Sequence, residues 1–125
     1  LGDLYDCAAQ AGYVALADDA LAETIAAWEA SGNSGKADDG QALDISGSST
    51  VEPISQCVLA ESGFAGSVEG PGTGDGFQRF CAGETDISDA SRAIKDEEAA
   101  DCEAAGVTYT ELIVAIDGMA VMTAA

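Results

Sequence analysis

The chain has 125 residues, with 23 acidic and 4 basic side chains and no histidine. This length suits one compact domain, and no run of about 18 apolar residues is present that could span a membrane. The strong negative charge excludes nucleic acid as a partner, because binding to a phosphate backbone needs clustered lysine and arginine. It also argues against long-range attraction of an anionic ligand, so an anion site in this chain would have to rely on local dipoles.

Residues 1–40 contain one predicted helix followed by a polar linker. Over residues 18–31 the apolar side chains recur at helical spacing, and we expect their face to pack on the main body. That face carries Leu21, Ile25 and Trp28. Residues 31–41 are rich in glycine, serine and aspartate, which indicates a linker. The sequence therefore divides into an N-terminal extension, residues 1–40, and a main domain, residues 41–125.

From residue 41 onward, strand-like and helical segments alternate. The first three expected strands are residues 43–46, 65–69 and 85–90. The apolar tail, residues 107–122, is expected to form two further strand segments, broken near Asp117-Gly118. A helix follows each of the first three strands. The first begins after Ser49, with a buried face at Val51, Ile54 and Val58. The second carries Phe77, Phe80 and Cys81 and ends at Gly83, and the third spans residues 95–105. This order predicts an α/β fold, with a mainly parallel sheet flanked by helices.

Three loops of the expected sheet are rich in hydroxyl and glycine residues. They follow the first three strands, at residues 47–50, 70–76 and 88–92. Ligands of such sheets bind beyond the carboxyl ends of the strands, so we expect the three loops to converge. A turn into a helix N-terminus presents free N–H groups in a positive dipole field, which binds an oxyanion without a basic side chain. The sequence thus predicts part of an anion-binding site.

Each loop also has a plainer interpretation. Ser49 can simply cap the following helix, in a capping box with Glu52. The glycine-rich turn at 72–76 lacks the pattern of a nucleotide-binding loop and is as compatible with an ordinary tight turn. Arg92 could give forked hydrogen bonds to a tetrahedral anion, or it could form a surface salt bridge with one of the many acids. Both interpretations stay open at this point.

The sequence contains no catalytic arrangement and no metal site of the zinc type. Without histidine, and without a Ser-Lys or Cys-His pair, we expect neither an enzyme nor a bound cofactor. The four cysteines lack CxxC spacing, so disulfides in an oxidising compartment are favoured over metal binding. Cys81 and Cys102 lie in consecutive expected helices and are the preferred pair.

Three segments carry a family resemblance: ISGSSTVEPIS (45–55), GTGDGFQRFCAGETDISDASRAIKDEEAADCEAAGV (72–107) and ELIVAIDGMAV (111–121). They resemble the phosphate-binding proteins of bacterial and archaeal phosphate ABC transporters. The resemblance implies a type II periplasmic-binding fold, in which two α/β lobes close on inorganic phosphate. It implies that residues 41–125 form the first lobe, with the second lobe absent. It also implies an extracytoplasmic location and a membrane permease as partner.

The resemblance assigns phosphate contacts to residues of all three loops: Ser49, Thr50 and Val51, then Thr73 and Gly74, then Ser91 and Arg92. Many relatives have an aspartate in the third loop, which accepts a proton from hydrogen phosphate and so rejects sulfate. The register places Ser91 at that point, with Asp89 as a nearby candidate. Relatives often have three glycines where this chain has Gly74-Asp75-Gly76, which brings a negative charge close to the anion.

Two other hypotheses stay open. The chain could be a structural or accessory subunit derived from one lobe, packed with other subunits of an extracytoplasmic assembly. It could also bind another oxyanion, such as sulfate or molybdate. The intact loops favour phosphate binding, whereas the missing second lobe and the unmatched residues 1–40 favour the accessory subunit.

Overall fold

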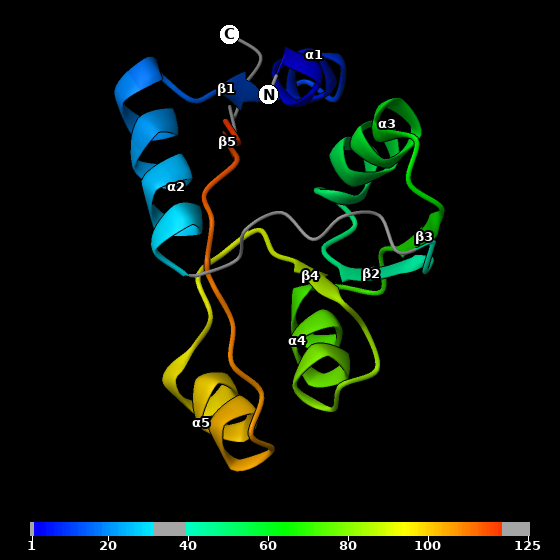
Figure 1. Cartoon of the computed structure of the whole chain (residues 1–125), viewed down its shortest axis with the longest axis vertical. Helices are drawn as coiled ribbons and strands as arrows, with labels where there is room; N and C mark the ends of the chain where they lie inside the picture. The colour runs from blue at the N-terminus through cyan, green and yellow to red at the C-terminus, as the bar shows by residue number, and fades with distance from the viewer. Residues whose placement is uncertain (1, 32–39, 119–125) are drawn as a thin grey trace, which may run out of the picture.

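A computed structural model describes residues 2–31 and 40–118 of the chain (Figure 1). At its centre is a parallel sheet with strand order β3-β2-β4. Its strands are β2 (Leu43–Gly47), β3 (Gly66–Glu69) and β4 (Ile87–Asp89). Helices α3 (Glu52–Ser62) and α4 (Thr73–Cys81) lie on opposite sides of the sheet, and α5 (Asp96–Ala104) contacts α4 (Figure 1). The predicted α/β architecture is confirmed, and each of these elements lies where the sequence pattern indicated.

The register of the sheet brings two strand ends level with each other. Gly47, the last residue of β2, pairs with Asp89, the last residue of β4. Strand β2 is central, so its residues Ile45 and Ser46 are both buried although they point to opposite faces. The carboxyl end of the sheet is therefore a shared edge, from which the loops to α3 and α4 and the loop after β4 all depart.

The N-terminal segment holds two helices, where the sequence pattern indicated one. They are α1 (Gly2–Gln10) and α2 (Asp18–Ala30). Helix α1 packs on α3, and a Cys7–Cys57 disulfide joins the two helices. Cys7 and Ala8 are buried together with Ile54 in one apolar cluster. The sequence pattern missed α1 because small side chains and a disulfide, which leave no apolar period, hold it in place.

Helix α2 does not bury the apolar face that its sequence predicts. None of its residues is buried, and Trp28 is 40% exposed. It lies beside the tail of the chain (Figure 1), where the Thr24 hydroxyl donates a hydrogen bond of 2.9 Å to the Ile113 carbonyl. The expected linker falls mostly on residues 32–39, outside the described residues, so the domain boundary at residue 40 stays a prediction.

The apolar tail pairs with the N-terminal segment and not with the parallel sheet. Strand β5 (Ala115–Ile116) is antiparallel to β1 (Val14–Ala15) in a separate pair. The expected fourth parallel strand was therefore wrong, because β-propensity indicates a strand without indicating its partner. The end of that tail, residues 119–122, lies outside the described residues. Across the ranges that the structure covers, no helix combines the length and apolar character needed to cross a membrane.

Candidate anion-binding site

Two glycines allow three chain segments to meet at the carboxyl edge of the sheet. A Cβ atom added at Gly47 would fall on the backbone of Asp89. A Cβ atom added at Gly76, in α4, would lie 2.5 Å from the Cα of Gly47 and 2.7 Å from the carbonyl oxygen of Ser46. The end of β2 therefore touches both β4 and α4 with no side chain between them, and only glycine permits this approach.

Backbone hydrogen bonds tie the three loops together at this edge. The N–H of Ser48 donates to the carbonyl of Asp89 at 2.9 Å. The N–H of Gly72 donates to the carbonyl of Gly47 at 2.7 Å. The first loop is thus bonded to the end of β4 and to the second loop, and the convergence predicted from the topology is present in the structure.

The second and third loops bring two hydroxyl groups together. The Oγ1 atom of Thr73 lies 3.1 Å from the Oγ atom of Ser91, and the N–H of Ser91 donates to the same Thr73 oxygen at 3.3 Å. Thr73 and Gly74 open α4, and the first N–H groups of an α-helix have no intrahelical acceptor. Three of the predicted site residues, Thr73, Gly74 and Ser91, are therefore neighbours.

The loop before α3 is organised by Ser48 and not by the predicted capping box. Within the described ranges no side chain caps α3, so the expected pairing of Ser49 with Glu52 was wrong. The carbonyl of Ser48 accepts the N–H groups of Val51 and Glu52 at 3.1 and 3.0 Å. The hydroxyls of Ser48 and Thr50 lie 2.9 Å apart. This turn leaves Ser49 and Thr50 exposed, but it uses the N–H of Val51, which is then unavailable to an anion.

Tyr13 reaches the same loop from the N-terminal segment. Its hydroxyl donates a hydrogen bond to the carbonyl of Thr50. Its ring packs against the apolar cluster that holds the Cys7–Cys57 disulfide. No sequence pattern connects residue 13 with the loop, because only the fold brings α1 onto α3. The N-terminal extension therefore supports the loop before α3 through this hydrogen bond.

Arg92 forms the salt bridge that was one of its two interpretations. Its Nη1 and Nη2 atoms donate to the two carboxylate oxygens of Glu98 at 2.8 and 2.7 Å. The guanidinium carbon lies 5.3 Å from the centre of the Phe77 ring. The bonds from Arg92 are the main cause that lowers the pKa of Glu98 to about 2. Within the described residues, no hydrogen bond joins Arg92 to Thr73 or Ser91.

Asp89, predicted only as a nearby candidate for the site, is buried at the end of β4. It is 8% exposed, and its Oδ2 atom has no hydrogen-bond partner among the described residues. Burial raises the pKa of its carboxyl group, the charge of Glu52 raises it further, and the Ser55 hydroxyl lowers it. Its place at the end of a strand and the family resemblance were the sequence signals for Asp89. Its burial could not be predicted, because burial depends on the helices that cover the sheet.

The disulfide favoured from the sequence is present and joins α4 to α5. Cys81, at the end of α4, is bonded to Cys102 in α5. Cys102 is fully buried. The bridge fixes α5, and with it Glu98, against the helix whose N-terminus carries Thr73. The described chain contains no free cysteine.

The protein-family model of the PBP superfamily domain matches residues 29–125, which include the parallel sheet and all three loops. The chain belongs to the PBP superfamily. The family resemblance identified from the sequence is thereby confirmed, and the sheet with its flanking helices is a PBP-like lobe. The match also includes the last residues of α2, so it begins before the expected domain boundary at residue 40.

Individual members of the PBP superfamily are close in sequence over part of this chain. Protein SphX of Synechocystis is 43% identical over 66% of this chain and 26% of its own length. The phosphate-binding protein PstS of Staphylococcus epidermidis is 44% identical over 72% of this chain and 30% of its own length. The crystal structure of a possible phosphate binding protein from Planctomyces limnophilus shares 45% identity, with a TM-score of 0.50 over 53% of this chain and 25% of that one.

The chain thus spans between a quarter and a third of the length of these relatives. Two of them carry names that state a function, and both are named for binding phosphate, not for a catalysed reaction. This agrees with the expectation that the chain is not an enzyme.

Proposed function

We propose that this chain binds inorganic phosphate, as the N-terminal lobe of an extracytoplasmic solute-binding protein that serves an ABC transporter. The observation that carries the proposal is the hydrogen-bonded meeting of the three loops, with the hydroxyls of Thr73 and Ser91 3.1 Å apart at the N-terminus of α4. The relatives named as phosphate-binding proteins support phosphate as the anion. No cofactor takes part in this function.

The anion is held by hydroxyl and N–H groups from the three loops. Ser49 and Thr50 contribute from the turn before α3, where both are exposed. Thr73 and Gly74 contribute from the start of α4, and Ser91 and Arg92 contribute from the loop after β4. Neutral donors and helix dipoles suit a chain with a formal net charge of −19, because they act at short range and need no attraction from a distance.

Asp89 discriminates between phosphate and sulfate in this proposal. A carboxylate can accept the proton that hydrogen phosphate carries at neutral pH, whereas sulfate carries no proton and would meet it as a like charge. The free Oδ2 atom of Asp89 and its burial support this role. Asp89 thus takes the place that the sequence register assigned to Ser91.

The two disulfides support a location outside the cytoplasm. One joins α1 of the N-terminal extension to the lobe, Cys7 to Cys57, and the other lies within the lobe, Cys81 to Cys102. Such bonds persist in oxidising compartments. A binding protein in that location would deliver phosphate to the membrane permease of its transporter.

The test is calorimetric titration of the full-length protein with phosphate and, separately, with sulfate. We expect phosphate to bind, and sulfate to bind at least about a hundredfold more weakly. The reason is that the buried Asp89 carboxylate would meet sulfate with no proton to accept. Replacing both Thr73 and Ser91 with alanine should weaken phosphate binding by at least about tenfold, because two donors to a charged ligand are lost.

Ser62→Ala is the matched control, because this hydroxyl lies at the far end of α3 and donates to the carbonyl of Leu59. It should leave phosphate binding unchanged. Absence of phosphate binding would refute the proposed function. Equal binding of sulfate would point to a general oxyanion site, and unchanged binding by the double variant would place the anion elsewhere.

A further inference from the structure

Glu98 of α5 holds the guanidinium group of Arg92 in one orientation beside the candidate site. The two carboxylate oxygens each accept one hydrogen bond from Arg92, at 2.7 and 2.8 Å. This paired geometry fixes the plane of the guanidinium group as well as its position. The side chain of Glu98 is only 16% exposed, so water competes little for its carboxylate. Its lowered pKa, about 2, means that the pair stays charged at neutral pH.

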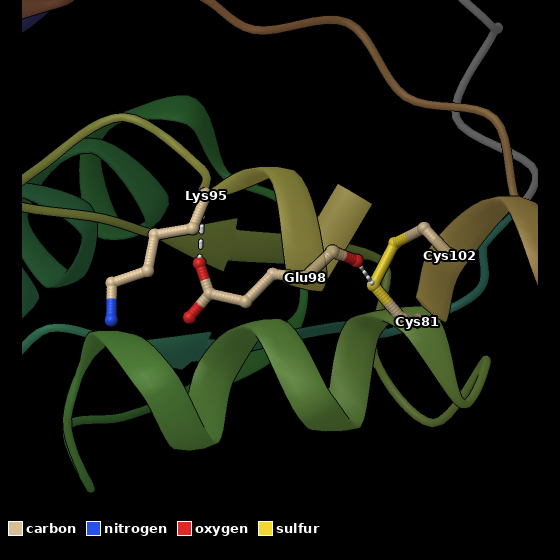
Figure 2. Close-up of a disulfide and its surroundings, with 4 residues drawn as sticks. All are labelled: Cys81, Lys95, Glu98 and Cys102. Atoms are coloured by element: carbon tan, nitrogen blue, oxygen red, sulfur yellow. Dashed lines mark hydrogen bonds between the residues drawn. A yellow bond between two sulfur atoms is a disulfide. The ribbon is translucent and has the colours of Figure 1, made fainter. Parts of the chain in front are cut away.

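Glu98 is itself anchored at two further points. Its Oε2 atom accepts the N–H of Lys95, at the start of α5, at 2.9 Å (Figure 2). Its carbonyl oxygen lies 3.6 Å from the sulfur of Cys81, a contact and not a donated hydrogen bond because this sulfur is part of the disulfide to Cys102 (Figure 2). The carboxylate that orients Arg92 is therefore fixed to the start of α5, and the backbone of Glu98 contacts the disulfide that joins α5 to α4.

Arg92 is connected through its neighbours to the hydroxyl pair of Thr73 and Ser91. Arg92 follows Ser91 in the chain, and its guanidinium group stacks on Phe77. Phe77 lies four residues after Thr73 in α4, so the two side chains share one face of the helix. The guanidinium group thus contacts a side chain that lies one helical turn along α4 from Thr73.

Arg92 retains hydrogen-bonding capacity in this arrangement. A guanidinium group has five N–H donors. Glu98 takes one from Nη1 and one from Nη2, and the carbonyl of Ala93 takes the second from Nη1 at 3.1 Å. Among the described residues, no acceptor is bonded to the Nε–H or to the second N–H of Nη2. Arg92 can therefore keep Glu98 and still donate to an anion.

We propose that Glu98 is a positioning residue for phosphate, which it affects only through Arg92, by keeping the two remaining N–H donors of that side chain at the edge of the site. The proposal rests on the proposed function. In a chain with 23 acidic residues, an arginine without a fixed partner would have many alternative carboxylates to pair with. Glu98 prevents this, because its carboxylate is held in place before the anion arrives.

The competing interpretation makes Glu98 a surrogate anion that phosphate must displace from Arg92. The two interpretations predict opposite signs for Glu98→Gln. If Glu98 positions Arg92, its removal weakens phosphate binding although a negative charge near the site is lost. If Glu98 competes with phosphate, its removal strengthens binding. Glu97→Gln removes the same charge one residue away, from a side chain that is 78% exposed, and is the matched control for the charge effect.

The experiment is calorimetric titration of full-length wild-type, Glu98→Gln and Glu97→Gln proteins with phosphate at neutral pH. We expect Glu98→Gln to weaken binding by about tenfold relative to Glu97→Gln, as for the loss of one well-oriented charge-assisted hydrogen bond. An affinity equal to or higher than that of Glu97→Gln would overturn the proposal.

A double-mutant cycle with Arg92→Ala shows whether Glu98 acts through Arg92. In the Arg92→Ala background, the further change Glu98→Gln should alter the dissociation constant less than twofold. A tenfold effect that persists without Arg92 would show a general structural role and refute the inference. If the wild-type protein binds no phosphate, the proposed function itself fails. If it binds phosphate and Arg92→Ala has no effect, the proposed function survives and this inference fails.

Discussion

Replacing Gly76 with alanine should destabilise the lobe, whereas the same replacement at Gly74, two residues earlier in α4, should not. A Cβ atom at Gly76 would lie 2.5 Å from the Cα of Gly47 and 2.7 Å from the carbonyl oxygen of Ser46. A Cβ atom at Gly74 has nothing within 4 Å. Neither glycine has a positive φ, so backbone strain does not distinguish them.

The expected magnitudes follow from packing and helix propensity. Carbon atoms prefer a separation of about 3.5 Å, so α4 would have to move about 1 Å away from β2 to accept the new methyl group. Because the obstructing atoms belong to the backbone, the cost lies near the upper end for overpacking, about 3 kcal/mol. Alanine recovers about 1 kcal/mol through its better helix propensity, which leaves a net loss of about 2 kcal/mol for Gly76→Ala. Gly74→Ala should gain about 0.5 kcal/mol.

Urea denaturation followed by far-ultraviolet circular dichroism measures both variants on the same scale. Phosphate titration gives a second readout, because moving α4 separates Thr73 from Ser91 and should weaken binding by Gly76→Ala. If Gly76→Ala is as stable as Gly74→Ala, the contact between α4 and β2 is not as close as described, and the argument for the convergence of the loops fails.

Two further predictions concern the core and the buried acid. Replacing both Cys7 and Cys57 with alanine should reduce the free energy of unfolding by about 4 kcal/mol. The reason is that the disulfide, which closes a loop with a sequence separation of 50, no longer restricts the unfolded chain. A loss below about 1 kcal/mol in urea denaturation would contradict this. Asp89→Asn should raise the melting temperature at pH 7 and change it little at pH 3. Since the folded pKa of Asp89 is raised, its ionised form costs stability only above its unfolded pKa, and the cost disappears at acid pH. An equal shift in melting temperature at both pH values would show that the negative charge of Asp89 does not destabilise the folded state.

Local features of the sequence were enough to predict the central architecture. The periods of apolar residues and the turn residues placed β2, α3, β3, α4, β4 and α5 close to their observed bounds. Gly83, predicted as a helix end, has a positive φ value. The alternation of strands and helices then implied a parallel sheet with its loops at one edge, because crossover connections between parallel strands place those loops on the same side.

Other features depended on contacts between segments far apart in the chain, which no local pattern encodes. The pairing of β5 with β1 and the burial of α1 are of this kind. The choice of Glu98 as the partner of Arg92, among 23 acidic residues, needed the position of α5. The burial of Asp89 needed the helices that cover β4.

The sequence by itself therefore determined which loops contain the hydroxyl and N–H donors, since donors belong to residue types and to helix starts. The tertiary structure alone decided which donors remain free. It committed the N–H of Val51 to Ser48 and three of the five donors of Arg92 to Glu98 and Ala93. It left the Oδ2 atom of Asp89 without a partner among the residues that the structure describes. The physical reason is that a donor or acceptor is free only when no other group of the folded chain reaches it.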